Sequence, residues 1–219
     1  MATHERAYQF TAKSEGGKDS NPHDLTLLCL IDAEKLALGG RYETYQNENG
    51  ETKKRVVGKI VHTNKGITFP TYKLVCKKCF GFAPNFDHFL SITNAEVEKI
   101  FVDEYFHAIR GEFINSEKVA IAVSDFCFNA GAHRAVKILQ SVLNLHYGKE
   151  LVIDGVIGWK TINGTNEVDA DSLFKFYNED RKRYYVNLAN YQTSQKGNLT
   201  GWLNRINALS KFVEKNGIS

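Results

Sequence analysis

The segment from Val119 to Asn129 constrains the fold more than any other stretch, because it is apolar on almost every side. A helix of that composition is buried within a protein and does not lie on its surface. Two of its few polar exceptions, Asp125 and Asn129, are four residues apart and so share one face. A carboxylate in such a place must be paired, hydrogen-bonded or open to a wet cleft. We therefore expect a central helix in which Asp125 has a structural or a substrate-orienting role, or else faces the cleft.

Further helices are predicted on both sides of this segment. One spans Thr71 to Cys79, and another begins at Thr93, where Thr93 and Glu96 have the spacing of a capping box. In the latter, apolar residues recur at helical spacing as far as Ile109. A third helix follows Gly131. The predominance of such patterns predicts a mainly α fold.

A long helix is predicted for residues 169 to 191. Its apolar side contains Leu173, Phe176, Tyr177, Tyr184 and Leu188. The run Arg181, Lys182 and Arg183 is predicted to form a basic face in contact with solvent, because charge runs on helices are usually solvated.

Residues 25 to 62 are predicted to form a small β-insert. Strand-like patterns occur at Leu25–Ile31, Tyr42–Tyr45 and Arg55–Val61, and Asn49-Gly50 supplies a turn. Two interpretations stay open, a decorative surface hairpin and a wall of a ligand cleft.

The composition limits the class of protein. With 219 residues and 42% hydrophobic content, the chain can bury one good core and is expected to form a single compact body. A net charge of +3 is far below the basic density of a nucleic-acid binder, although it suits an acidic polymer. No apolar run is long enough to span a membrane, and the N-terminus lacks the apolar part of a signal peptide. We expect synthesis in the cytoplasm and no stable membrane insertion.

The four cysteines are too few and too scattered for a disulfide scaffold, and we expect them to be reduced. Cys76 and Cys79 have the spacing of half a zinc site, but no second pair at matching distance completes it. They are interpreted as two helix cysteines one turn apart, and no metal or cofactor is predicted.

A pair of acidic residues and a hydroxyl suggest cleavage of a sugar polymer. Residues 4 to 15 are compatible with a helix that stops at Gly16-Gly17, which places Glu15 in its last turn. The helix end disfavours ionisation of a carboxylate there, so Glu15 is a candidate general acid. Asp24 follows in a turn, and Thr63 comes after the β-insert.

These motifs resemble those of a known family. Glu15-Gly16-Gly17, then Asn21-Pro22-His23-Asp24, then Thr63-Asn64-Lys65-Gly66-Ile67-Thr68 are similar to the N-acetylmuramidase and secretion-activator family of lysozyme-like glycoside hydrolases, family 108. The resemblance implies a lysozyme-like helical fold, Glu15 as the catalytic acid, and Asp24 and Thr63 as the residues that assist it. About 38 residues separate Asp24 from Thr63, where family members have almost none.

The resemblance continues towards the C-terminus, through the motifs Asp125-x-x-x-Asn129-x-Gly131, Asp154-Gly155-Val156-Ile157-Gly158-x-x-Thr161, Arg181-x-x-Tyr184 and Gly201-Trp202-x-x-Arg205. It implies a catalytic region over residues 1–130 with the insert at 25–62, and a helical peptidoglycan-binding-like region over 131–219 packed on it. Candidate substrate-binding residues are Asn64, Asp125, Asn129, Trp202 and Arg205. Trp202 either stacks on a sugar or belongs to the core.

The predicted function is a peptidoglycan hydrolase, an N-acetylmuramidase that acts on glycan strands of the bacterial wall after release or export. A holin or a secretion system is its candidate partner for reaching the wall. One alternative is a wall-binding or secretion-assisting protein that kept this fold without the chemistry, and another is a zinc or redox protein that uses Cys76 and Cys79. Phage lysis, secretion and wall remodelling are equally compatible with the motifs.

Overall fold

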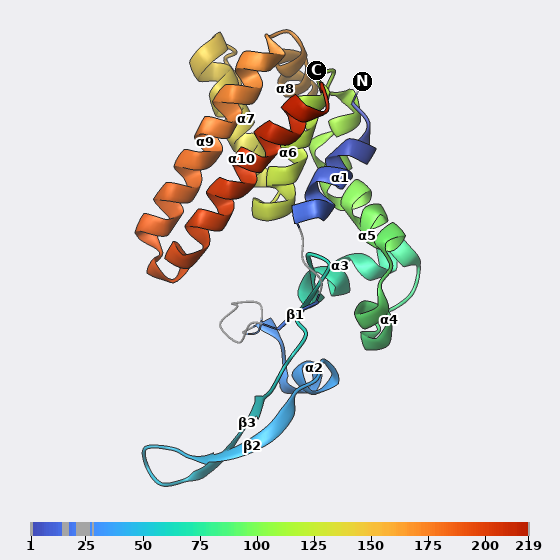
Figure 1. The fold of residues 1–219 in the computed structure, drawn as a ribbon, viewed down its shortest axis with the longest axis vertical. Helices are drawn as coiled ribbons and strands as arrows, with labels where there is room; N and C mark the ends of the chain where they lie inside the picture. Colours follow the sequence, from blue (N-terminus) through green and yellow to red (C-terminus); the bar gives the residue numbers. More distant parts are fainter. Residues whose placement is uncertain (1, 15–17, 21–26, 28, 219) are drawn as a thin grey trace. The chain divides into compact units, whose positions relative to one another are not determined.

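The computed structural model describes residues 2–14, 18–20, 27 and 29–218 (Figure 1). It divides into two compact units. The first, the helical unit, contains Met1–Ser14 and Phe101–Ser219, and the second, the insert unit, contains Glu15–Ile100. Each is described by itself.

The helical unit is built from α-helices joined by loops, 3₁₀ segments and a π-helical turn. Its elements are α1 (His4–Ser14), η2 (Val102–Phe106), η3 (His107–Ile109), η4 (Gly111–Phe113), α6 (Glu117–Ala130), α7 (Ala132–Tyr147), α8 (Trp159–Asn166), α9 (Ala170–Tyr191), η5 (Thr193–Asn198) and α10 (Leu199–Lys215).

Helix α6 is the centre of this unit, as the sequence predicted. Ten consecutive residues from Lys118 to Cys127 are buried. Helices α1, α7 and α9 all pack against α6, and α10 runs beside α9 (Figure 1). A helix surrounded on several sides needs apolar residues on all of them, which explains the composition of this segment.

The helix that begins at Thr93 is interrupted, contrary to the continuous pattern predicted as far as Ile109. Helix α5 (Asn94–Phe101) gives way to the π-helical turn η2 and then to the 3₁₀ turn η3. Ile100, Phe101, Phe106 and Ile109 are nonetheless all buried. A π-helical turn changes the angular spacing of side chains, so this segment buries a different set of residues from an uninterrupted helix.

The prediction that Arg181 lies on a solvent-exposed basic face of α9 is wrong. Its side chain is 0% exposed, whereas Arg183 beside it in the run is exposed. Leu173, Tyr177 and Arg181 recur every four residues and lie on the same buried face. Arg181 tolerates this burial because a carboxylate on α6 neutralises it, as shown below.

The insert unit combines short helices with two small sheets. Its elements are β1 (Lys18–Asp19), α2 (Asp32–Ala37), β2 (Arg41–Gln46), β3 (Thr52–Val57), β4 (Thr63–Asn64), β5 (Ile67–Thr68), α3 (Phe69–Phe80), α4 (Phe86–Ser91) and α5, whose last residue Phe101 belongs to the helical unit.

The predicted hairpin is present. Strands β2 and β3 pair antiparallel, with Tyr42 opposite Val56 and Gln46 opposite Thr52. Nearly every residue of both strands is exposed. The mainly α fold with a small β-insert is therefore confirmed.

The strand predicted at residues 25–31 is wrong where the structure describes it. Leu27 and Cys29 lie in a helical turn, and the following residues form α2. The Glu34 carboxylate accepts a hydrogen bond from the backbone N–H of Ile31 at 3.0 Å, which caps the first turn of that helix. Residues 25, 26 and 28 lie outside the described residues.

Two local predictions in the insert unit are confirmed. Thr93 and Glu96 form a reciprocal capping box, with bonds of 2.9 and 3.2 Å between each side chain and the other residue's backbone N–H. Cys76 and Cys79 are buried one turn apart on α3. The boundary predicted at residue 130, between the catalytic region and the peptidoglycan-binding-like region, remains a prediction. The two compact units are defined by contacts between residues and not by sequence motifs.

Candidate functional site

Glu15 and Asp24, the two predicted catalytic acids, lie outside the described residues. Glu15 directly follows Ser14, the last residue of α1. Thr11, one turn before that end, is 2% exposed and belongs to the buried face of the helix. What surrounds Thr11 therefore determines where the end of α1 is held.

Thr63 lies on β4, the middle strand of a small antiparallel sheet between β1 and β5. Its backbone is opposite Asp19 on one side and Thr68 on the other. The Thr63 side chain is half-buried, and its Oγ1 lies 3.0 Å from Nδ1 of the buried His62. A hydroxyl placed in this way has one partner that fixes its direction and can still bind a further polar group.

A tight turn follows Thr63 and explains the Asn-Lys-Gly sequence there. Lys65 has φ +49° and Gly66 has φ +80°, and positive φ at both central positions is the mark of the two-residue hairpin turn favoured by strand twist. Asn64, which precedes the turn, is 3% exposed and donates from Nδ2 to the Phe89 carbonyl at 2.8 Å. The structure thus places Asn64 where it holds β4 to α4.

Asp125 is fully buried and pairs with two arginines from different helices. Nη2 of Arg181 donates to Oδ2 at 2.7 Å, and Nη2 of Arg205 donates to Oδ1 at 2.8 Å. Nε of Arg205 also donates to Oδ1, at 3.0 Å, and Thr11 Oγ1 donates to the same oxygen at 3.3 Å. We call Asp125, Arg181, Arg205 and Thr11 the Asp125 network.

The charges of this network decide the ionisation of Asp125. Burial by itself raises the pKa of a carboxyl group, but the charges of Arg205 and Arg181 outweigh it and hold the pKa of Asp125 below its ordinary value. Asp125 is therefore ionised, and it compensates the charge of Arg181, whose side chain is inaccessible to solvent. Arg181 also donates to the Ala122 carbonyl at 3.3 Å and lies over the Phe126 ring at 5.1 Å.

Three of the predicted substrate-binding residues line a single hollow on the helical unit. Asn129, Trp202 and Arg205 surround a cavity of about 420 Å³ together with Gly201, Asn204 and Ala208, and we call this the Trp202 hollow. Asn129 donates from Nδ2 to the Asp125 carbonyl at 2.7 Å. Trp202 is half-buried and stacks on Tyr185, with ring centroids 4.6 Å apart. Trp202 therefore packs on the core, as one of the two interpretations predicted, and one part of it lines the hollow; sugar stacking remains a prediction.

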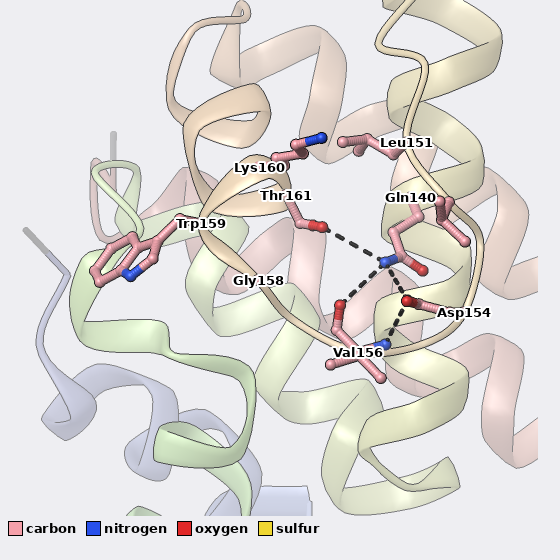
Figure 2. Close-up of a pocket in the computed structure, with 9 residues that line it drawn as sticks. Gln140, Leu151, Asp154, Val156, Gly158, Trp159, Lys160 and Thr161 are labelled. Atoms are coloured by element: carbon pink, nitrogen blue, oxygen red, sulfur yellow. Dashed lines mark hydrogen bonds between the residues drawn. The ribbon is translucent and has the colours of Figure 1, made fainter.

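The Asp154 motif forms a tight turn, as predicted, and α8 begins directly after Gly158. Oδ1 of Asp154 accepts from the Val156 N–H and from Nε2 of Gln140, each at 2.9 Å (Figure 2). The Val156 N–H and then the Gln140 amide hold the pKa of Asp154 below its ordinary value. The exposed carboxylate is therefore charged.

Arg181 is the member of the Asp125 network that the sequence analysis assigned wrongly. A signal for it was present, since Arg181 is four residues beyond Tyr177 and eight beyond Leu173, on the apolar face. A buried position on a long helix, together with an unpaired Asp on the central helix, indicates an ion pair.

Comparison with known proteins agrees with the family resemblance that the motifs indicate. The model of the family described as glycosyl hydrolase 108 matches residues 8–131, and a model described as predicted peptidoglycan domain matches residues 134–207. A solved structure entitled "Structure of Brucella abortus SagA" is similar with a TM-score of 0.61 and 22% identity, and the match covers 94% of this chain and 93% of that one. At this identity the likeness shows the fold alone. A search of curated proteins found no match.

Proposed function

Because the chain belongs to the glycosyl hydrolase 108 family, and is thus a glycosidase of the peptidoglycan-hydrolase kind, we propose that it is an N-acetylmuramidase. The bond cleaved is the β-1,4 linkage between N-acetylmuramic acid and N-acetylglucosamine. The observation that carries this proposal is the family match over residues 8–131, a range that includes Glu15, Asp24 and Thr63.

In this proposal Glu15 is the general acid. Cleavage requires a proton on the oxygen of the leaving sugar as the C–O bond breaks, and a protonated carboxyl group beside that oxygen supplies it. Glu15 follows a helix C-terminus, where the helix dipole favours the neutral form of a carboxyl group.

The Asp125 network supports the proposal by its position. The bond from Thr11 to Asp125 fixes the last turn of α1 against α6, four residues before Glu15 in the sequence. A general acid acts only when it is held within hydrogen-bond reach of its target. We assign Asp125 as a positioning residue that acts through Thr11 and Arg205.

Asp24 and Thr63 complete the proposed chemistry. A second carboxylate either holds the attacking water or stabilises the positive charge that develops on the sugar ring. The half-buried Thr63 hydroxyl, fixed by His62, is suited to orient a water molecule. The separation of the two carboxyl groups decides between inversion and retention of configuration.

The Trp202 hollow is the proposed contact site for the glycan in the helical unit. Trp202 offers an aromatic face, Asn129 an amide and Arg205 a charged donor around one cavity. An apolar platform with a few polar groups is the usual composition of a small-molecule site.

We further propose that the protein acts on the wall after release or export from the cytoplasm. Among the described residues no helix is both long and apolar enough to cross a membrane. The proposed partner for passage to the wall is a holin or a secretion system. Lysis by a phage and assistance to secretion both require the same cut in the wall.

Product analysis tests the cleaved bond. Purified wall sacculi are digested, the new reducing ends are reduced with borohydride, and the fragments are identified by mass spectrometry. Cleavage as proposed yields reduced N-acetylmuramic acid at the new end. Reduced N-acetylglucosamine would show the other glycosidic specificity, and an absence of new ends would support a wall-binding protein without hydrolase activity.

A further inference from the structure

A second hollow lies around the Asp154 turn, apart from the residues assigned above to the glycan. Its volume is about 310 Å³, at the lower end of the range for ligand pockets. The residues that line it, from α7, the following loop and α8, are Gln140, Leu151, Val152, Asp154, Val156, Gly158, Trp159, Lys160 and Thr161. We call it the Asp154 groove (Figure 2).

The loop that forms the groove is held rigidly although it contains no helix or strand. The Asn144 side chain on α7 makes two bonds of 2.8 Å with the backbone of Leu151. Gln140 donates to Asp154 and accepts from the Gly155 N–H at 2.9 Å. Gly155 has φ +75°, and a Cβ there would lie 2.7 Å from the His133 carbonyl oxygen. The groove is therefore formed in advance of any ligand, which lowers the entropic cost of binding.

This rigid loop exposes apolar side chains that are not part of the hydrophobic core. Val152 is 76% exposed and Val156 is 66% exposed, and both line the groove. Exposed apolar residues gathered in one hollow commonly mark a binding site.

Two opposite charges accompany this apolar lining. Asp154 is ionised, and because its two bonds use Oδ1, Oδ2 keeps its capacity to accept. Lys160 is exposed and makes no ion pair with any residue that the structure describes. Figure 2 shows the two residues at opposite ends of the hollow, with Gln140 and Thr161 between them.

From this arrangement we infer that the Asp154 groove binds the peptide stems of peptidoglycan. The inference rests on the proposed function only for the identity of the polymer. Stem peptides carry small methyl side chains for the apolar wall, a free carboxylate for Lys160 and the side-chain ammonium of a diamino acid for Asp154. The glycan strand has acetylated amino groups and therefore no ammonium to pair with Asp154.

Isothermal titration of the full chain, carrying Glu15→Gln to prevent cleavage, tests the inference. The probes are the synthetic peptide L-Ala-γ-D-Glu-L-Lys-D-Ala, the same peptide with the lysine acetylated, the same peptide with its carboxylates amidated, and chitotetraose as a glycan. The unmodified peptide is expected to bind most tightly. Each modification should weaken binding about 2- to 5-fold, the range for exposed charge pairs.

Two matched variants show which charged residue of the groove pairs with which charged group of the peptide. Asp154→Asn keeps an oxygen that accepts from Val156 and Gln140, and Lys160→Gln keeps the length of the side chain. Acetylation should no longer matter in Asp154→Asn, and amidation should no longer matter in Lys160→Gln. Equal affinity of the parent protein for all three peptides, binding of chitotetraose alone, or no binding at all would each overturn the inference. Because no cleavage is measured, these outcomes do not depend on the muramidase assignment.

Discussion

Glu15 carries the proposed proton transfer, and its replacement by glutamine removes the proton while it keeps the shape. We expect Glu15→Gln to melt at the same temperature as the parent protein and to clear wall material at least 100-fold more slowly, as is typical for the loss of a general acid. Turbidity clearing of sacculi measures the rate. Asp24→Asn and Thr63→Val, assayed beside it, should be impaired to a comparable and to a partial extent.

Equal clearing by Glu15→Gln and the parent protein would remove Glu15 from its assigned role. Full activity of both Asp24→Asn and Thr63→Val would instead leave Glu15 acting without them.

Asp125 has a different role, because its carboxylate compensates a buried arginine. Asp125→Asn leaves Arg181 charged and inaccessible to solvent, and breaking a buried ion pair in this way costs about 3–5 kcal/mol. In a protein of this size the melting temperature should fall by roughly 6–20 °C. Calorimetry measures this fall, and Glu43→Gln, which breaks only the exposed pair with Arg55, is the control that should change little.

Activity measurements on the same Asp125→Asn protein distinguish a positioning role of Asp125 from a role in the proton transfer. If Asp125 only positions α1 and Arg205, activity below the melting transition falls without a change in the pH of half-maximal activity. A shifted pH profile at an unchanged melting temperature would place Asp125 among the groups that influence the proton of Glu15.

At the scale of the element, the insert unit contains a carboxylate whose ionisation should stabilise the fold. The Thr93 backbone N–H, followed by His88, lowers the pKa of Glu96 to about 2 from 4.5. A lowered pKa in the folded state gives stabilisation that is complete above pH 4.5 and is lost as the pH falls towards 2. His88 extends the contact to Tyr72, whose hydroxyl lies 2.7 Å from His88 Nδ1.

Glu96→Gln tests this dependence, because glutamine preserves the capping box but does not titrate. Thermal melts at pH 6, 4 and 2.5 should show the parent protein more stable at pH 6 and the difference shrinking as the pH is lowered. A difference that stays constant with pH would assign the effect of Glu96 to packing.

The β2–β3 hairpin is the element whose removal should harm the fold least. Its strands bury almost none of their side chains. Replacing residues 43–55 by Asn-Gly leaves Tyr42 paired with Val56 across a two-residue turn. We expect a soluble protein with a nearly unchanged melting temperature and an altered rate on intact wall. Loss of folded protein would show that the hairpin belongs to the core.

The elements also show which local signals can be predicted from sequence. The capping box at Thr93 and the Asp154 turn follow from interactions between near neighbours, and the burial of α6 follows from its apolar composition. All three agree with the predictions. The π-helical turn of η2 and the helix at Asp32–Ala37 were missed because packing and a single capping carboxylate override the apparent periodicity. Arg181 was misplaced for a related reason, since its partner is 56 residues away in the sequence.

At the scale of the whole molecule, the motifs and the contacts divide the chain differently. The two family models meet between residues 131 and 134. In contrast, α6 before that boundary packs on α7 and α9 after it. Both arginines that pair with Asp125 also come from the C-terminal side. The motifs therefore indicate the order of the two segments along the chain. The contacts show that the two segments bury their apolar surfaces against each other.

Truncation at residue 131 is therefore expected to destroy the fold of the first segment, although its motifs would be intact. The cut exposes the apolar sides of α6 that face α7 and α9, and it leaves the Asp125 carboxylate without Arg181 or Arg205. Circular dichroism of the 1–131 fragment should show a loss of helical signal and of the cooperative transition that belongs to the helical unit. Coexpression with residues 132–219 should restore solubility if the two parts share one core. The hairpin-shortened chain is the control for the loss of residues as such, because all the positions it removes except the partly buried Asn47 are exposed. A 1–131 fragment that melts cooperatively and clears wall material would show instead that the catalytic segment folds independently, with the C-terminal segment as a separable wall-binding module.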